Sequence, residues 1–453
     1  MSFAVANREN RIVRRVSRRG FLCRSAASGL AIPALWLAND GIAGESRSKS
    51  DRLVVGCIGN GGMGRGDAAA ASRFGDIAAL ADVDRGRSEA LAGNEKIFKG
   101  KKKPEIFDDY RKLLDRKDIQ IVTISTPDHW HTKIAVDALQ AGKDVYCQKP
   151  LTLTIDEGKI LCRVVRQTGR VLQVGTQQRS ENNEMFLKAV AMCRHGRLGK
   201  IKRATCVIGG GPKGGPFKKT APPPGLNWER WLGQAPLVDY IKERCHGSFR
   251  WWYEYSGGKL TDWGAHHVDI AQWAIGMEGS GPKTIEPLAA VHSQPLKNGL
   301  PTLDDCYNTA NTFQILCTFA DGTEILIRND VDNGITFEGE KGKFFVNRGK
   351  LTGEPVDRLK QDPISEDALK KLRKGKASNS HMGNFVACVK DRSTPISDVF
   401  SHHRALTTCH LANIAIRLGR KLTWDAEKEA IVGDAEANAW LSRPQRKGYQ
   451  IEG

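Results

Sequence analysis

Three side chains in this 453-residue sequence have the types needed to bind and transfer protons: Lys149, Asp262 and His266. Lys149 follows a short apolar run and precedes Pro150, which cannot continue a strand ladder, so it is expected at the carboxyl end of a buried strand. Asp262 and His266 are four residues apart, and on a helix this spacing puts them on one face. We therefore expect the carboxylate to hydrogen-bond the imidazole and orient it as a general base.

A glycine-rich loop follows the first apolar run, residues 53–58. Gly59, Gly61 and Gly64 have the G-x-G-x-x-G spacing between a predicted strand and a predicted helix. The first glycine permits a tight turn, the second admits a pyrophosphate, and the third lets the helix pack close to the strand. The loop therefore predicts a dinucleotide-binding site.

The acid expected at the ribose is Asp82, which ends the apolar run 77–81 about 20 residues beyond the glycines. A carboxylate there favours NAD over NADP, although Arg85 and Arg87 keep NADP open. The loop of residues 126–131 is expected at the same sheet edge, where His131 either touches a ligand or caps a helix beginning near Thr132. The residues predicted to bind the cofactor are Gly59, Gly61, Gly62, Met63, Gly64, Asp82, Thr126, Pro127, His131, Gln148 and Lys149.

The elements that must position these residues alternate up to about residue 176. Continuous apolar runs predict buried parallel strands at 53–58, 77–81, 119–125, 144–147 and 171–175. Helices are predicted at 108–116 and 132–141, and another opens at the capping box Thr154-x-x-Glu157.

Beyond residue 176 the pattern changes. A helix at 183–195 and a strand at 201–208 lead into a long Gly/Pro/Lys loop at 209–225. Strands without intervening helices then imply a largely antiparallel sheet, and the predicted ranges are 285–292, 309–319, 323–329 and 334–346. Helices near 380–390 and 402–418 close the chain.

Two other uses of the polar and aromatic residues are weaker. Metal ligation by His266 and Asp262 with His129 or His131 is disfavoured because the spacing of a closed metal site is missing. Six aromatic residues pack a core or, less favoured, form a carbohydrate platform: Trp228, Trp231, Trp251, Trp252, Tyr253 and Tyr255.

The composition is that of a soluble protein with a net charge of +18, concentrated in part in the first 50 residues, which hold nine basic and three acidic residues. Nucleic-acid binding is disfavoured, because the basic runs at 99–103 and 370–376 lack interleaved aromatics. None of the eleven cysteines has a Cys-x-x-Cys spacing, so mostly free thiols are expected.

The N-terminus reads as an export signal. Residues 17–22, Ser-Arg-Arg-Gly-Phe-Leu, resemble the twin-arginine motif and precede an apolar run at 26–37 that is too short to span a bilayer comfortably. The twin-arginine export machinery is thus an expected partner, with a periplasmic or other extracytoplasmic location; a disordered basic tail is the alternative. No other segment approaches membrane length.

Taken together, the chain resembles the Gfo/Idh/MocA oxidoreductases over roughly residues 51 to 420. The resemblance rests on the glycine motif at 59–64, on Gln148-Lys149-Pro150 in the place of the family's Glu-Lys-Pro, and on Asp262-x-x-x-His266. It implies an N-terminal Rossmann domain and a C-terminal α/β domain with a large, mostly antiparallel open sheet that often mediates homo-oligomerisation. The implied organisation is a leader at 1–50, the Rossmann domain at 51–176, the substrate and oligomerisation domain at 177–400 and a closing helix and tail at 401–453.

The resemblance also implies a function: NAD(P)-dependent hydride transfer at a hydroxyl of a sugar, polyol or glycoside. Lys149, Asp262 and His266 would meet above the nicotinamide. Some relatives hold NAD tightly and cleave glycosides by transient oxidation, so a redox-assisted glycosidase or lyase is an alternative, as is a non-catalytic NAD- or sugar-binding protein. Gln148 replaces the family's glutamate, and the loss of a negative charge beside Lys149 should favour the neutral amine and put the proton relay in doubt.

Overall fold

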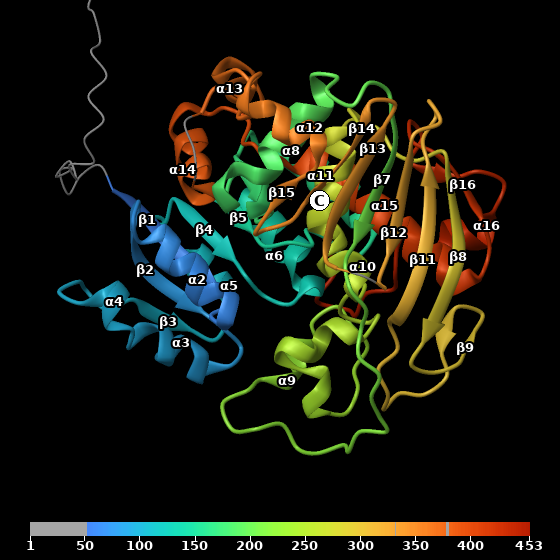
Figure 1. The fold of residues 1–453 in the computed structure, drawn as a ribbon. Helices are drawn as coiled ribbons and strands as arrows, with labels where there is room; N and C mark the ends of the chain where they lie inside the picture. The colour runs from blue at the N-terminus through green and yellow to red at the C-terminus, as the bar shows by residue number, and fades with distance from the viewer. Residues whose placement is uncertain (1–51, 331, 377–379) are drawn as a thin grey trace, which may run out of the picture. The chain divides into compact units, whose positions relative to one another are not determined.

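The computed structural model describes residues 52–330, 332–376 and 380–453, which belong to one compact unit (Figure 1). The twin-arginine motif and the rest of the leader lie outside the described residues.

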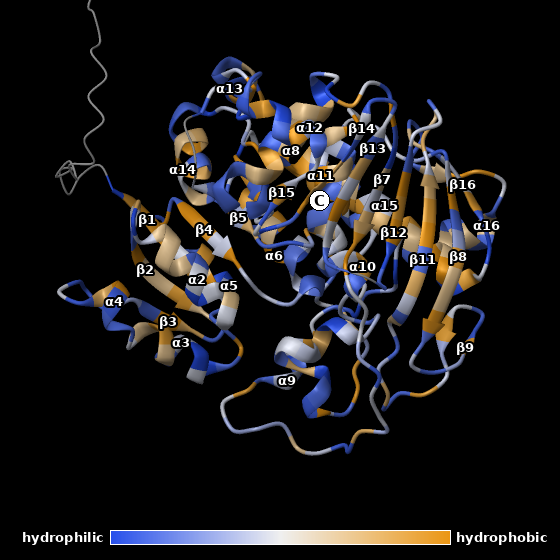
Figure 2. Cartoon of the chain, viewed as in Figure 1, coloured by the Kyte–Doolittle hydropathy of each residue, from blue (hydrophilic) through white to orange (hydrophobic). Residues whose placement is uncertain are grey.

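The N-terminal sheet has six strands in the order β3-β2-β1-β4-β5-β6, and all neighbouring strands are parallel. The strands are β1 Leu53–Ile58, β2 Gly75–Ala81, β3 Glu105–Phe107, β4 Ile121–Ile124, β5 Asp144–Cys147 and β6 Leu172–Val174. Figure 2 shows hydrophobic colouring along β1 and β2, as expected of strands that helices cover on both faces. The sequence predicted all of them except the short β3.

Helices connect these strands: α2 Gly62–Ala71, α3 Arg85–Ala92, α4 Glu95–Phe98, α5 Tyr110–Leu114, α6 Asp128–Gln140 and α7 Ile155–Thr168. The predicted cap of α7 is confirmed, because Thr154 Oγ1 accepts a hydrogen bond from the Glu157 backbone N–H at 3.3 Å. The predicted helix 132–141 is confirmed as α6, but its predicted start was wrong. The helix begins at Asp128 with Pro127 in the N-cap position, so His131 lies within its first turn and does not cap it.

The second sheet has nine strands in the order β15-β14-β13-β7-β12-β11-β8-β16-β17. Its strands are β7 Ile201–Val207, β8 Thr284–His292, β11 Ala310–Thr318, β12 Glu324–Arg328, β13 Gly334–Gly339, β14 Gly342–Val346, β15 Leu351–Thr352, β16 Leu422–Asp425 and β17 Ala430–Ile431. Only β7 and β12 pair in parallel, which confirms the largely antiparallel prediction. The run 334–346, expected to continue the strand pattern, is the hairpin β13–β14, and β15, β16 and β17 were missed. A separate pair is β9 Leu296–Lys297 with β10 Leu300–Pro301.

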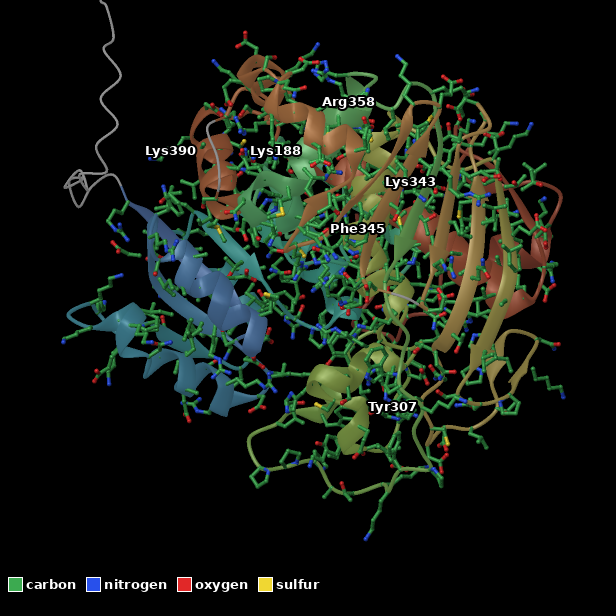
Figure 3. The ribbon with its side chains drawn as sticks, in the orientation of Figure 1. Lys188, Tyr307, Lys343, Phe345, Arg358 and Lys390 are labelled. Atoms are coloured by element: carbon green, nitrogen blue, oxygen red, sulfur yellow. The ribbon has the colours of Figure 1, made fainter. Side chains whose placement is uncertain are left out.

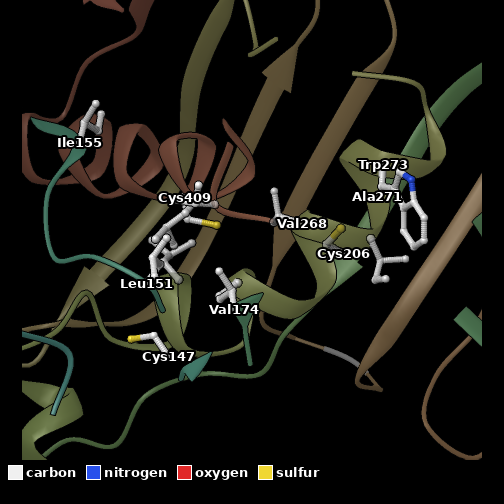
Figure 4. Packing of buried hydrophobic residues seen from close by; sticks show 14 of the residues in the cluster. Cys147, Leu151, Ile155, Val174, Cys206, Val268, Ala271, Trp273 and Cys409 are labelled. Atoms are coloured by element: carbon white, nitrogen blue, oxygen red, sulfur yellow. The ribbon is translucent and has the colours of Figure 1, made fainter. Parts of the chain in front are cut away.

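The helices of this part are α8 Met185–Arg194, α9 Trp228–Leu232, α10 Lys259–Asp262, α11 Gly264–Ala274, α12 Glu354–Asp357, α13 Glu366–Leu372, α14 His381–Asp391, α15 Val399–Leu418 and α16 Ala435–Ala439. One hydrophobic cluster holds residues of both sheets and of α11 and α15. Figure 4 shows Cys147 and Val174 of the first sheet in the same packing as Val268 of α11 and Cys409 of α15. The end of β5 and the start of α11 are therefore fixed relative to each other by core packing.

The ten cysteines in the described residues are all unpaired and buried, as expected of free thiols. In the same residues, no helix is both long enough and apolar enough to cross a membrane.

Candidate active site

A cavity of about 300 Å³ opens at the carboxyl edge of the parallel sheet, between β1 and β4, where the strand order reverses. This is the place at which open α/β sheets bind ligands. The residues predicted to bind the cofactor line it, with the exception of Gly64: Gly59, Gly61, Gly62, Met63, Asp82, Thr126, Pro127, His131, Gln148 and Lys149. The structure therefore brings together residues from four different strand ends in one groove.

The glycine loop is shaped as its sequence requires. Gly59 has φ +81°, and a Cβ there would stand 2.6 Å from the Thr126 backbone nitrogen. A Cβ on Gly64 would stand 1.9 Å from the Gly59 carbonyl oxygen, so Gly64 serves close packing of α2 and does not line the groove. The first turn of α2, whose amino end faces the groove, has no acidic residue to compete with a bound phosphate.

Asp82 has a role that the sequence did not show. Its carboxylate accepts hydrogen bonds from the backbone N–H of Asn60 at 2.7 Å and of Asp84 at 2.9 Å, so it holds the glycine loop in place. Burial raises the pKa of Asp82 to about 6. A carboxylate has about four lone-pair sites, so two backbone bonds leave Asp82 able to accept from a ribose hydroxyl.

Arg85 and Arg87, the two arginines that left NADP possible as the cofactor, already have acidic partners. Arg87 Nε lies 3.2 Å from Asp84 Oδ2, and Arg85 lies 2.8 Å from Glu89 and 3.5 Å from Asp108. With these partners and Asp82 beside the ribose position, the groove suits NAD better than a 2′-phosphate.

Buried polar atoms in and beside the groove also fit a dinucleotide. Thr126 Oγ1, Gln148 Oε1 and Asn60 Oδ1 are buried without a hydrogen-bond partner in the described part of the chain. Buried polar atoms are normally paired, so unpaired ones beside a cavity indicate positions where ligand donors are expected. The amide and hydroxyl groups of NAD can supply such donors.

Gln148 is held by Asp67 of α2. Gln148 Nε2 donates to both carboxylate oxygens of Asp67, at 3.0 and 2.9 Å, and Ser125 Oγ donates to the same group at 2.6 Å. Burial raises the pKa of Asp67 to about 6. The glutamate that the family has at this position is thus an amide here, and that amide contacts the carboxylate of Asp67. The acidic group nearest to position 148 is therefore on α2 and not on the residue next to Lys149.

Lys149 is paired with Asp262, as the resemblance implied. Its Nζ donates to Asp262 Oδ1 at 2.5 Å and to the Asp262 backbone carbonyl at 3.0 Å, while Arg250 Nε donates to the same Oδ1 at 3.3 Å. Burial alone would raise the pKa of Asp262, but Lys149 and Arg250 outweigh it and hold the pKa at about 2. Asp262 is therefore a permanent carboxylate that positions the lysine.

The predicted hydrogen bond between Asp262 and His266 is wrong. Asp262 ends α10, and α11 starts at Gly264, so the two residues are not on one continuous helix. In the described part of the chain no group hydrogen-bonds a His266 ring nitrogen, and its Nδ1 is buried. Burial lowers the pKa of His266 well below its usual value, and the cations Lys149 and Arg348 lower it further. The imidazole is therefore neutral at physiological pH and able to accept a proton.

The other histidines are held by the protein. The ring nitrogens of His131 lie 2.7 Å from the Pro150 carbonyl and 2.9 Å from the Thr126 carbonyl, and His129 Nε2 lies 2.9 Å from the Trp231 carbonyl. His267 contacts Gln178 and Asn333 and is structural, as expected. No group of three or more His, Cys, Asp or Glu side chains among the described residues is arranged to hold a metal ion.

The far wall of the groove comes from segments that the motif analysis missed. It includes Trp231, His246, Phe249, Arg250 and Tyr449. Tyr449 belongs to the C-terminal tail, packs edge-on against Trp130 at 5.7 Å between ring centres and donates a hydrogen bond to Glu229 at 2.7 Å. These residues have no characteristic spacing, so only the folded chain reveals them.

The carbohydrate platform considered for the aromatic stretch is not formed. Four of its six side chains are buried together in one cluster: Trp228, Trp231, Trp252 and Tyr255. Trp228 and Trp231 stack at 4.8 Å, and Trp252 is fully buried. Core packing, the favoured alternative, is what the structure has.

Comparisons with known proteins agree with this geometry. Residues 52–176 match the model of an oxidoreductase family with an NAD-binding Rossmann fold, and residues 215–451 match that family's C-terminal alpha/beta domain. The chain is 26% identical to the uncharacterized oxidoreductase YrbE of Bacillus subtilis, over 50% of this chain and 55% of that protein. The match thus spans little more than half of that relative's length.

Two further relatives are longer matches. The scyllo-inositol 2-dehydrogenase (NAD(+)) of Bacillus subtilis is 25% identical over 71% of this chain and 80% of its own. The crystal structure of the WlbA dehydrogenase from Bordetella pertussis in complex with NADH and UDP-GlcNAcA has the same fold, with a TM-score of 0.57, 16% identity and coverage of 83% of this chain and 99% of that one. From the two family models, which together cover most of the described residues, the chain belongs to the Gfo/Idh/MocA oxidoreductase family.

Proposed function

We propose that this protein is an NAD-dependent oxidoreductase that removes a hydride from a hydroxyl-bearing carbon of a sugar, polyol or glycoside. The observation that carries the proposal is the ion pair of Lys149 with Asp262 at the edge of the cavity that fits a dinucleotide, with the buried His266 near enough for Lys149 to lower its pKa. Relatives named as inositol dehydrogenases support the substrate class.

The chain's own groups have distinct roles in this reaction. His266 accepts the hydroxyl proton, because burial and neighbouring cations keep its imidazole neutral before the reaction. Lys149 donates a hydrogen bond to the reacting oxygen, and Asp262 holds the lysine and balances its charge. Bound NAD would supply the hydride acceptor, C4 of its nicotinamide ring.

The test is to mix pools of carbohydrates and polyols with the protein and NAD and to record the absorbance of the reduced cofactor. A rise with one pool, lost in Lys149→Ala, is expected. Failure of every pool to reduce NAD would count against the proposal.

A second candidate is a glycosidase or lyase that keeps its NAD and returns the hydride to the sugar. Backbone bonds favour it, because Asn227 N–H donates to Val83 O at 2.9 Å and Arg85 N–H donates to Gly225 O at 3.1 Å, which ties the loop 209–227 to the strand end that holds Asp82. Such ties restrict the exit of a cofactor. NAD that copurifies in a one-to-one ratio, with glycoside cleavage but no net reduced cofactor, would select this candidate over the first. A non-catalytic binding protein is excluded if Lys149→Ala or His266→Ala abolishes turnover.

We also propose that residues 17–22 direct export through the twin-arginine pathway to an extracytoplasmic location, and that the folded protein is a homo-oligomer. Support for export comes from the paired arginines before a short apolar run. Fusion of residues 1–50 to a reporter that functions only after export should give activity that Arg18→Lys with Arg19→Lys removes. Light scattering of the folded protein at several concentrations tests the oligomer.

A further inference from the structure

Positive charge exceeds negative charge where the proposed reaction takes place. Lys149 and Arg250 both contact the single carboxylate oxygen Asp262 Oδ1, at 2.5 and 3.3 Å. One carboxylate therefore balances only one of the two cations, even before the remaining neighbours are considered.

Two further cations lie at the indole of Trp263, the residue that follows Asp262. The Arg348 guanidinium carbon is 4.7 Å from the Trp263 ring centre, and Lys259 Nζ is 5.7 Å from it. Lys259 begins α10, whereas Arg348 comes from the turn between β14 and β15, about ninety residues further along the chain. Among the described residues, neither has a carboxylate within salt-bridge distance.

These cations differ in exposure: Lys259 is half-buried, whereas Arg348 is exposed to solvent, so an unpaired charge is costly mainly at Lys259. Burial lowers the pKa of Lys259; the Asp262 carboxylate opposes this shift, whereas Lys149 and Arg250 add to it. Partial burial also lowers the pKa of Arg348, against the opposing effect of Asp262 and Glu181. Cation–π contact with an indole offsets part of this cost, but it does not cancel a charge. A partner that brings negative charge would relieve it.

The neighbouring acids do not fill this role. Asp128 accepts a hydrogen bond from Ser256 Oγ at 2.5 Å, and burial raises its pKa to about 7, so it is only partly charged at neutral pH. Burial also raises the pKa of Glu181, which accepts from the His381 backbone N–H at 3.4 Å and makes no ion pair with Arg348.

An unpaired polar group marks the same place. His266 is 4% exposed, and its Nδ1 has no hydrogen-bond partner among the residues that the structure describes. Its ring lies 6.1 Å from the Trp263 ring, the one that Lys259 and Arg348 approach. The two cations and the proposed proton acceptor thus all lie around the Trp263 indole.

We propose that the substrate is an anionic sugar, whose carboxylate or phosphate group is bound by Lys259 and Arg348 while its reacting hydroxyl meets His266 and Lys149. This inference rests on the proposed function for the identity of the reacting group. It adds the chemical class of the substrate: a uronic or aldonic acid or a sugar phosphate, in preference to a neutral sugar or polyol. The guanidinium of Arg348 can bind either group in a bidentate manner.

The test is calorimetric titration of the full chain loaded with NAD, using matched pairs of ligands. Each pair contains a neutral sugar and an anionic derivative of it. The four pairs are glucose with glucuronate, galactose with galacturonate, glucose with gluconate, and glucose with glucose 6-phosphate. At least one anionic member is expected to bind about tenfold or more tightly than its neutral parent, and the preference should fall as salt rises. The relative affinity of carboxylate and phosphate members tells which anionic group the site takes.

The variants Arg348→Ala and Lys259→Met should each reduce this preference about tenfold or more, with NAD binding unchanged. Lys343→Ala is the matched control, because Lys343 is an exposed cation on β14, the strand that leads into the Arg348 turn (Figure 3). Circular dichroism checks that each variant folds, and the salt dependence of the wild type gives an answer without any variant.

A panel in which no anionic sugar binds more tightly than its neutral parent overturns the inference. So does a preference that survives when Arg348→Ala and Lys259→Met are combined in one chain. Binding is measured without turnover, so the two proposals fail separately. Tight binding of an anionic sugar with no reduction of NAD by any sugar would sink the proposed oxidoreductase and leave the charge preference standing. Turnover of neutral sugars alone would do the reverse.

Discussion

The two ends of the candidate active site differ in how they are built. At the cofactor end, charges are paired within short stretches of chain, as in Arg87 with Asp84 and Arg85 with Glu89, and Asp82 is bound by backbone amides. At the substrate end, Arg348 and Lys259 have no carboxylate partner among the described residues, and His266 has no hydrogen-bond partner there. At the first end the charged groups are already paired, and only uncharged polar atoms such as Thr126 Oγ1 and Gln148 Oε1 lack partners among the described residues. At the second end it is cations that lack carboxylate partners.

This difference indicates which end of the site discriminates among ligands. A site whose charged groups are already paired binds a constant partner, the dinucleotide, through shape, backbone and a few uncharged polar atoms. A site that leaves charges and an imidazole unsatisfied discriminates among partners, because the wrong ligand leaves those groups unpaired. Changes at the cofactor end should therefore affect the binding of NAD, whereas changes at the substrate end should affect the choice of substrate.

The largest expected effect on ligand affinity is at the cofactor end. In Gly64→Ala the new Cβ would stand 1.9 Å from the Gly59 carbonyl, so the loop must move away from α2. We expect NAD affinity to fall about 100-fold, or nearly 3 kcal/mol, as measured by fluorescence titration. Gly66→Ala is the control on the same helix, since a Cβ there meets nothing within 4 Å. Equal NAD affinity in the two variants would contradict the conclusion that close packing at Gly64 shapes the loop for NAD.

Gln148→Glu tests the junction between the two ends. Protonated Asp67 is favoured in the folded state, whose pKa is about 6 against an ordinary 3.8, so the unfolding free energy falls as pH rises through this window. A second carboxylate at position 148 should extend that loss to higher pH and lower the stability by about 1–3 kcal/mol above pH 6. Thermal unfolding across pH 4 to 8 measures it.

The matched control for that variant is the exchange of both groups, Asp67→Asn with Gln148→Glu. It restores one amide and one carboxylate in contact, so most of the lost stability should return. A single variant as stable as the wild type at pH 8 would contradict the contact between these two side chains.

The smallest expected effect concerns the tail that closes the groove. Tyr449→Ala removes a ring that packs on Trp130 and lines the cavity, and should raise the dissociation rate of NAD about fivefold, which corresponds to about 1 kcal/mol. Tyr449→Phe keeps the ring and loses only the hydrogen bond to Glu229, so most of the retention should remain. Stopped-flow displacement of NAD measures both; a larger loss in Tyr449→Phe would show that the ring is not what holds the cofactor.

The sequence predicted well those site residues that directly follow a predicted strand. The glycine loop, Asp82 and Thr126 follow buried strands directly, and a continuous apolar run predicts such strands without knowledge of the rest of the fold. The helix of Asp262 and His266 was drawn as continuous because spacing alone does not show the break at Trp263. Arg250, Arg348 and Tyr449 reach the site from distant segments, so no spacing could have identified them.

The assignment of His266 as the proton acceptor is tested by a single-turnover measurement of NAD reduction in His266→Ala, paired with an NAD titration of the same sample. We predict that NAD affinity stays within about twofold of the wild type while the rate of reduction by the substrate falls about 100- to 10,000-fold, the range for loss of a general base. A variant that still reduces NAD at the wild-type rate, with the cofactor bound, would contradict the assignment of His266 as the proton acceptor.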